Sequence, residues 1–229
     1  MSKGVIIALD IEARGQGAIR HGILSIGVCV GAVEKEYVFE KTRFDILPLP
    51  NQRLEDRCKE TFWDKHPAIL KALTKNALPA NIQMVGFREI IDRYDRMFPS
   101  KVYIVCDNPG FDFGMINTYL DQFDIPTLNY TYDGQYRNTH DADSYARGLM
   151  HYDATKQWMS NADLAKYIDA TDIDLDAHDH MPENDAQVIY KLHRRALVAR
   201  ILPGLTCAQF IMCIVAGFVL GIYVKVLYT

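Results

Sequence analysis

Residues 5–15 read VIIALDIEARG, a run of five apolar residues followed by two acids that one isoleucine separates. A short continuous apolar run of this kind is typical of a strand buried in the centre of a sheet. Residues two apart in an extended chain point to the same side, so we expect Asp10 and Glu12 to share one face. Two neighbouring carboxylates repel each other unless a cation lies between them, and oxygen ligands suit Mg²⁺ or Mn²⁺. The stretch therefore predicts a central strand that leads into a candidate metal site, while the same D-x-E pattern also occurs at solvated strand ends.

The segments around this strand alternate between strand and helix patterns. Apolar runs predict a strand at 5–9 and further strands at 23–30, 36–41 and 102–105, the first three forming an antiparallel meander. Helical spacing predicts helices over residues 67–73, 87–97, 111–120, 143–150, 161–167 and 182–199. Strands followed by alternating strands and helices imply an α/β fold with a mixed central sheet flanked by helices.

Composition limits the class of protein. The chain has 229 residues, of which 49% are hydrophobic and 24% charged, so it is neither disordered nor fibrous. The formal net charge of -4 argues against a protein that holds nucleic acid by broad cationic attraction, so such contact must be local or carried by metal ions. Five cysteines without a C-x-x-C pair favour a reducing compartment, and the N-terminal apolar run meets Asp10 too early for a signal peptide.

A third acid follows the second predicted central strand. The segment from Asn108 to Asp112 reads NPGFD and leads into the predicted helix over 111–120. Taken alone, Asp112 could be an ordinary acidic residue that the dipole of a helix N-terminus favours.

A fourth acid stands at the start of the predicted helix over 182–199, five residues after His180. Asp185 shares a helix face with Val188, Ile189 and Leu192, so we expect it to point inward, which is costly unless a metal or hydrogen-bond donors receive it. His180 on the preceding loop could approach the same site and take a proton from water. A zinc site on the segment 178–180 (HDH) fits less well, because no cysteine cluster or suitably spaced third histidine accompanies it.

Together these motifs resemble the DEDDh branch of the 3'-to-5' exonucleases, which have an RNase H-like fold. The matches are Asp10 and Glu12 in ALDIEARG, Asn108 to Asp112 in CDNPGFDFGMIN, and His180 with Asp185 in HDHMPENDAQ. Their order, context and H-x-x-x-x-D spacing make the resemblance fairly specific, and it covers residues 4–200. The branch with a tyrosine in the third motif fits less well. Residues 60–73, ETFWDKHPAILKAL, further resemble a tryptophan-containing segment of phage exonuclease A-like enzymes and related bacterial exoribonucleases.

The resemblance implies metal-dependent hydrolysis of DNA or RNA from a 3' end, with release of nucleoside 5'-monophosphates. It assigns two Mg²⁺ or Mn²⁺ ions to four acids and the role of general base to His180. The implied metal ligands are Asp10, Glu12, Asp112 and Asp185. The residues implied in binding single-stranded nucleic acid or 3' ends are Ala13, Arg14, Gly15, Asn108 and Trp63. Trp63 or its neighbour Phe62 could stack on a base. The alternative is a position in the core, which is the commoner place for a tryptophan.

Two other classes remain open at this point: a catalytically inactive, membrane-tethered RNase H-like module that binds nucleic acid, and an RNase H-like endonuclease. The four acids and the histidine disfavour the first class, and the H-x-x-x-x-D loop disfavours the second. DNA and RNA cannot be told apart, because recognition of the 2'-hydroxyl depends on contacts that short motifs do not reveal.

The C-terminal region differs sharply from the rest of the chain. The 24 residues from 201 to 224 carry no charge, which is long enough for a helix to cross a bilayer. We therefore expect an exonuclease domain over 1–200 and a transmembrane anchor over 203–224. Arg194, Arg195 and Arg200 before the anchor place the domain in the cytoplasm by the positive-inside rule. Gly217 and Gly221 form the G-x-x-x-G spacing found in paired membrane helices, which leaves a homodimer open. The alternative is a buried core helix.

Overall fold

A mixed five-stranded sheet forms the centre of the molecule, with strand order β3-β2-β1-β4-β5. The computed structural model describes residues 4–137, 139–141, 172–173 and 179–201, and these statements concern that part of the chain. The strands are β1 (Val5–Ala13), β2 (Ile23–Ala32), β3 (Val38–Asp45), β4 (Val102–Cys106) and β5 (His140–Asp141). The first three pair antiparallel, β4 runs parallel to β1, and β5 runs parallel to β4. The predicted meander and mixed sheet are confirmed.

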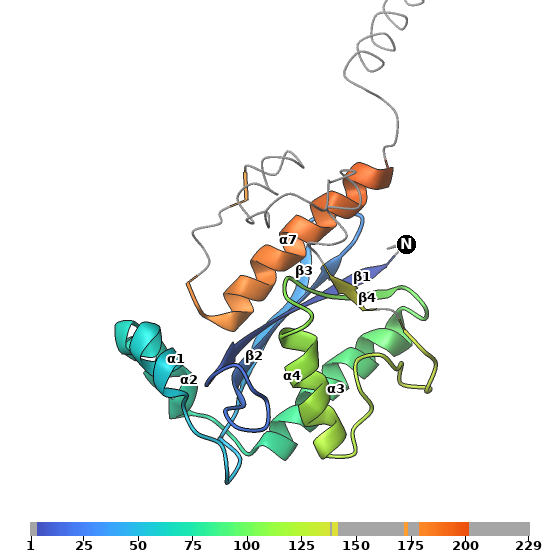
Figure 1. The fold of residues 1–229 in the computed structure, drawn as a ribbon. Coiled ribbons are helices and arrows are strands. Elements are labelled where there is room, and N and C mark those ends of the chain that lie inside the picture. Colours follow the sequence, from blue (N-terminus) through green and yellow to red (C-terminus); the bar gives the residue numbers. More distant parts are fainter. Residues whose placement is uncertain (1–3, 138, 142–171, 174–178, 202–229) are drawn as a thin grey trace, which may run out of the picture.

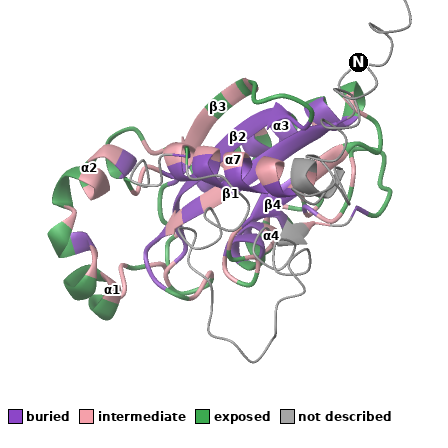
Figure 2. Cartoon of the chain, turned by 90° about the horizontal axis from the view of Figure 1, so that it is seen from above, coloured by how far each residue is buried: buried purple, intermediate pink, exposed green. Residues whose placement is uncertain are grey.

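Helices cover both faces of this sheet (Figure 1). On one face α3 (Ala80–Met97) and α4 (Asp112–Gln122) pack against the odd-numbered residues of β1. On the other face α7 (Pro182–Ile201) crosses the strands and packs against Ile6 and Ala8. The alternation of side chains along a strand therefore assigns Asp10 and Glu12 to the face that α7 covers. Figure 2 shows that buried residues concentrate in the sheet and the helix faces that meet it.

A short helical unit lies beside the end of the sheet where β1 finishes. It consists of α1 (Asp56–Thr61), a 3₁₀ turn (Trp63–Lys65) and α2 (Pro67–Lys75). Its outer surface is largely exposed (Figure 2), and Trp63 and Leu73 anchor it in a small apolar cluster with Leu24 of β2. Pro67 occupies the first turn of α2, where the missing N–H costs nothing. The sequence analysis predicted α2 but neither α1 nor the 3₁₀ turn.

The boundaries of several elements differ from the predicted ones. The strand β1 continues to Ala13, so both of its acids lie within the strand and not beyond it. The strand β3 begins at Val38 and ends at Asp45, displaced from the predicted 36–41. The helix α3 begins at Ala80 instead of residue 87, because Ala80 and Met84 pack into the core. The predicted helices over 143–150 and 161–167 lie outside the described residues.

Within the described residues, no helix combines the length and apolar character that crossing a membrane requires. The predicted anchor over 203–224 lies outside those residues. The arginines before it belong to α7, where Arg194 donates to the Glu34 carbonyl oxygen at 3.2 Å and Arg195 pairs with Asp172 at 2.5 Å.

Candidate active site

Three functional side chains from two distant parts of the chain meet at the end of β1. Glu12, His180 and Asp185 each offer a ligand atom, and these atoms lie within 4.8 Å of one another. Nδ1 of His180 lies 3.7 Å from Oε1 of Glu12. Asp185 is 1% exposed in the first turn of α7, on the same inward face as Val188, Ile189 and Leu192, as the helical spacing predicts.

Asp10 and Asp112 carry the strongest electrostatic signature of the site. Burial raises the pKa of Asp10 well above its usual value, and the negative charges of Asp112 and Asp107 add to this effect, followed by Glu12 and Asp185. Burial also raises the pKa of Asp112 to about 8, with a further contribution from Asp107. The backbone N–H of Asn108 donates to Oδ2 of Asp112 at 3.3 Å and partly opposes the rise. All four predicted acids therefore share one electrostatic environment.

This donor set fits divalent cations. Burial and the like charges around them disfavour ionisation of Asp10 and Asp112, and a cation among the acids would favour it. Carboxylate oxygens are the ligands that Mg²⁺ and Mn²⁺ prefer, and the imidazole of His180 would suit a softer ion equally well. The ligand atoms of Glu12, His180 and Asp185 lie within 4.8 Å of one another. Asp10 interacts electrostatically with Glu12, Asp185 and Asp112.

A glycine of β2 allows α7 to come this close. Gly27 pairs with Asp10 in the sheet, and a Cβ atom at position 27 would lie 1.9 Å from the carbonyl carbon of Pro182 and 2.4 Å from the nitrogen of Glu183. Only glycine therefore lets the first turn of α7 rest on the sheet beside the acids. Further along the same strand, a Cβ at Gly31 would lie 2.3 Å from the ring of Tyr190.

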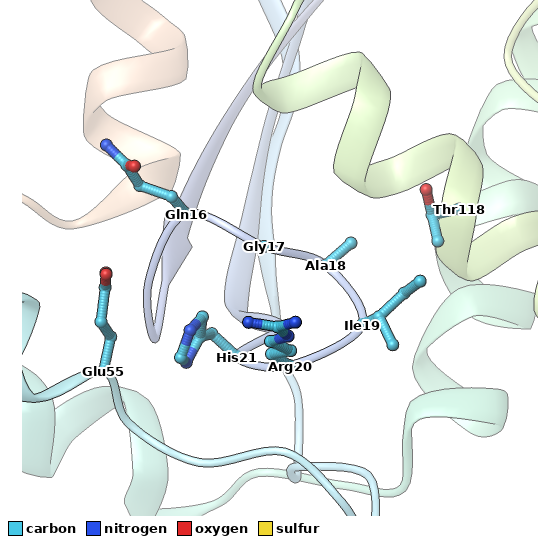
Figure 3. A pocket seen from close by; sticks show the side chains of 8 residues that line it. All are labelled: Gln16, Gly17, Ala18, Ile19, Arg20, His21, Glu55 and Thr118. Carbon is cyan, nitrogen blue, oxygen red and sulfur yellow. The ribbon is translucent and has the colours of Figure 1, made fainter.

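Two adjoining pockets open next to this cluster. The smaller has a volume of about 200 Å³ and is lined by residues that include Glu12, Ala13, Gly15, Phe62 and Phe111. The larger has a volume of about 490 Å³ and lies over the loop between β1 and β2, with Glu55 on one side and Thr118 on the other (Figure 3). Gln16 and Glu55 line both pockets, so the two lie side by side.

The residues predicted to bind substrate fall into two groups. Gly15 and Ala13 line the smaller pocket, and Asn108 is exposed in the loop before α4. The Arg14 side chain instead points into the interior, where it is 6% exposed and donates to the carbonyl oxygens of Ile23 and Ile46. Trp63 is 1% exposed, and its Nε1 donates to the carbonyl oxygen of Ala13 at 3.1 Å. Both side chains bond to interior carbonyl oxygens, and Trp63 also lines the smaller pocket, so their contact with a nucleotide stays a prediction.

Three residues of the site carry weak sequence signals. Asp107 stands directly after β4, and functional side chains often lie at the carboxyl ends of strands. That position could have indicated it. Gly27 sits in an apolar strand, where glycine weakens pairing and often marks a close approach. His66 lies in the WDKHP segment, and nothing in that segment indicates that its ring lies 5.0 Å from the ring of His180.

No protein-family model matches the chain, and no curated protein matches it in sequence. Solved structures do match. The nuclease domain of 3'hExo, a DEDDh family member bound to rAMP, shows a TM-score of 0.57 at 13% identity, over 87% of this chain and 92% of that one. The zinc-bound complex of E. coli ExoI with ssDNA shows a TM-score of 0.60 at 14% identity, over 88% of this chain and 41% of that one. Cell-death related nuclease 4 shows a TM-score of 0.56 at 14% identity, over 88% of this chain and 64% of that one.

These likenesses establish that the chain has the fold of DEDDh exonuclease domains, which is RNase H-like. The chain spans less than half of the E. coli ExoI chain, so it corresponds to one part of that protein. The resemblance seen in the sequence is thus supported at the level of the fold.

Proposed function

We propose that the protein is a metal-dependent 3'-to-5' exonuclease that releases nucleoside 5'-monophosphates from single-stranded ends of DNA or RNA. The observation that carries the proposal is the meeting of Glu12, His180 and Asp185 within 4.8 Å, in a fold shared with exonucleases. The neighbours support the substrate class, since one is bound to rAMP and another to ssDNA. Closer kinship with phage exonuclease A-like enzymes is a further part of the proposal and rests on the segment over 60–73 alone.

The acids would hold two Mg²⁺ or Mn²⁺ ions through Asp10, Glu12, Asp112 and Asp185. When bound, the ions would neutralise the scissile phosphate and the charge that develops on the leaving 3' oxygen. Nδ1 of His180 faces the carboxylates and would accept the proton of the attacking water. Oε1 of Glu12, 3.7 Å away, would stabilise the imidazolium that results.

The adjoining pockets offer a path for the strand. We place the terminal nucleotide in the smaller pocket beside Glu12 and the preceding nucleotides over the larger one (Figure 3). Arg57 lines the smaller pocket and Arg20 the larger, beside Glu12 and Glu55, so each pocket offers one guanidinium to a phosphate although the chain as a whole is acidic. Local cations of this kind suit a phosphodiester backbone.

Product sizing tests the proposal. The full-length protein is incubated with end-labelled single-stranded DNA and RNA in Mn²⁺, and mononucleotides are expected in metal and none in chelator. Asp185→Asn should abolish turnover and weaken metal binding more than ~100-fold. Loss of a metal ligand should reduce metal affinity at least as much as loss of a group that only orients a ligand. A circular strand should stay intact. Cleavage of the circle would favour an endonuclease, and metal-independent binding without cleavage would favour the inactive module.

His180→Ala separates the base from the ligands. Turnover should fall by ~10² to 10⁴, while the Mn²⁺ dissociation constant measured by calorimetry should change little. If metal binding collapses together with turnover, His180 is a ligand and the proposed role is wrong. His180→Gln, which keeps a polar side chain but not a base, serves as the matched variant.

A further inference from the structure

Two aromatic rings, Phe62 and His66, contact the ring of the proposed base. The Phe62 ring meets the His180 ring edge to face, with centroids 4.7 Å apart and planes at 90°. The His66 ring lies 5.0 Å from His180 and 4.7 Å from Phe62. Each member of the set therefore contacts both of the others.

This ring set is tied to the strand that carries the acids. Phe62 packs against Trp63 edge to face at 4.8 Å, and Trp63 donates from Nε1 to the Ala13 carbonyl oxygen at 3.1 Å. Ala13 directly follows Glu12 in β1. A continuous line of contacts therefore runs from the strand of Glu12 through two rings to His180.

His180 needs such support. It lies on the loop before α7, its side chain is 30% exposed, and its φ of 59° falls in the left-handed region that disfavours residues with a Cβ. Asp179 steadies the backbone of this loop by accepting from the N–H of Met181 at 3.0 Å and from Asn184. These bonds fix the main chain, and the ring neighbours contact the imidazole itself.

We propose that Phe62 and His66 are positioning residues that hold the His180 imidazole in line with Glu12. The inference rests on the proposed function, in which His180 is the base. Edge-to-face contacts of this kind favour one ring orientation over others, and small misplacements of a catalytic group reduce rates strongly. The short unit over residues 56–75 would then hold the base, on the loop before α7, in position relative to the acid on β1.

A double-mutant cycle in the full-length protein tests the proposal. Phe62→Leu, which keeps apolar volume but removes the ring, should lower kcat roughly 10- to 100-fold and change KM little. In a His180→Ala background the same substitution should cost nothing further, because no base remains to be positioned. Phe62→Tyr should restore the rate. A merely structural role would lower the rate by the same factor in both backgrounds, and that result would overturn the proposal.

A second pair of variants covers the case in which Phe62→Leu fails to fold. His66→Ala should lower kcat, and His66→Phe should restore it, since the proposal needs a ring at position 66 and not a titratable group. Phe39→Leu is the matched control, because Phe39 belongs to a separate aromatic cluster with Tyr94 and Phe98 and should leave kcat unchanged.

The orientation of the ring gives a readout that does not depend on turnover. In the metal-free protein, the imidazole NMR signals of His180 should broaden through exchange in His66→Ala and Phe62→Leu but stay sharp in the ring-preserving variants. Unchanged signals together with an unchanged kcat would overturn the proposal. If His180→Ala itself has no effect on turnover, the assignment of the base fails, which is a different result from failure of the ring contacts.

Discussion

The two faces of the central sheet carry side chains of very different size. Toward α3 and α4, β1 and β2 present large apolar residues that are almost fully buried: Val5, Ile7, Leu9, Ile11, Ile26, Val28 and Val30. Toward α7, the middle of the same two strands presents Ala8, Gly27, Cys29 and Gly31, followed by the acids Asp10 and Glu12.

The difference shows how one sheet serves stability and chemistry at once. Burial of large side chains on the α3 and α4 face supplies most of the hydrophobic stabilisation. Small residues on the other face let α7 lie close to the strands, which brings Asp185 within reach of Glu12. Substitutions on the two faces should therefore separate loss of stability from loss of catalysis.

Gly27→Ala should have the largest effect. The added Cβ would lie 1.9–2.4 Å from backbone atoms of Pro182 and Glu183, which no rotamer change relieves, so α7 must lift from the sheet. We expect a stability loss of about 1–3 kcal/mol and a turnover loss of at least ~100-fold, because the acids and the base separate. Urea unfolding and initial rates measure the two effects.

The neighbouring residue on the other face provides the control. Ile26→Val should cost about 0.5–1.5 kcal/mol of stability and leave turnover of the folded protein nearly unchanged. If both variants lose stability and activity in proportion, the faces are not specialised and the comparison fails.

The same comparison explains which features the sequence could predict. The apolar run of β1, its alternation and the inward face of α7 follow from local periodicity, so the meander and the burial of Asp185 were predictable. The close approach at Gly27 and the contact between His66 and His180 depend on tertiary packing between distant segments, which no local pattern encodes. The interior hydrogen bonds of Arg14 and Trp63 were not predictable, because adjacency to a motif in sequence does not say which way a side chain points.

The acid on the α4 side should make the metal-free protein sensitive to pH. Asp112, with a pKa of about 8 in the fold, keeps its proton to higher pH than in the unfolded chain, where an aspartate titrates near pH ~4. Because the folded state then binds more protons, the free energy of unfolding should fall as pH rises from about 4 to about 8, by on the order of a few kcal/mol.

Asp112→Asn should reduce this slope, since asparagine does not titrate, and Asp10, whose pKa burial also raises, should account for the part that remains. Unfolding in urea at several pH values in chelator measures it, with Asp133→Asn as a control at an exposed loop. Metal affinity of the unmodified protein should rise over the same window, because the ligand must lose its proton to bind. A slope of unchanged size in Asp112→Asn would assign the whole effect to another group.

Arg14→Gln should affect stability and not substrate binding. The guanidinium is buried and donates to the carbonyl oxygens of Ile23 and Ile46, which join the end of β2 to the segment after β3. Loss of these charge-assisted bonds should cost about 2–3 kcal/mol. KM for an oligonucleotide should stay near its original value in the folded variant. A raised KM with unchanged stability would restore the predicted contact with the terminal nucleotide.

Removal of residues 202–229 should have the smallest effect on turnover and the largest on location. The uncharged run over 201–224 satisfies its backbone in lipid only as a helix, and 24 residues at ~1.5 Å each exceed a hydrocarbon core of ~30 Å. In the described part of the chain, helices already cover both faces of the sheet, so the catalytic fold does not need this run as cover. We therefore expect a protein that ends at Ile201 to stay soluble and to keep its rate within about twofold, whereas the full-length protein resists alkaline extraction from membranes. Release of the full-length protein at high pH, with misfolding of the shortened one, would show instead that the run is a core helix.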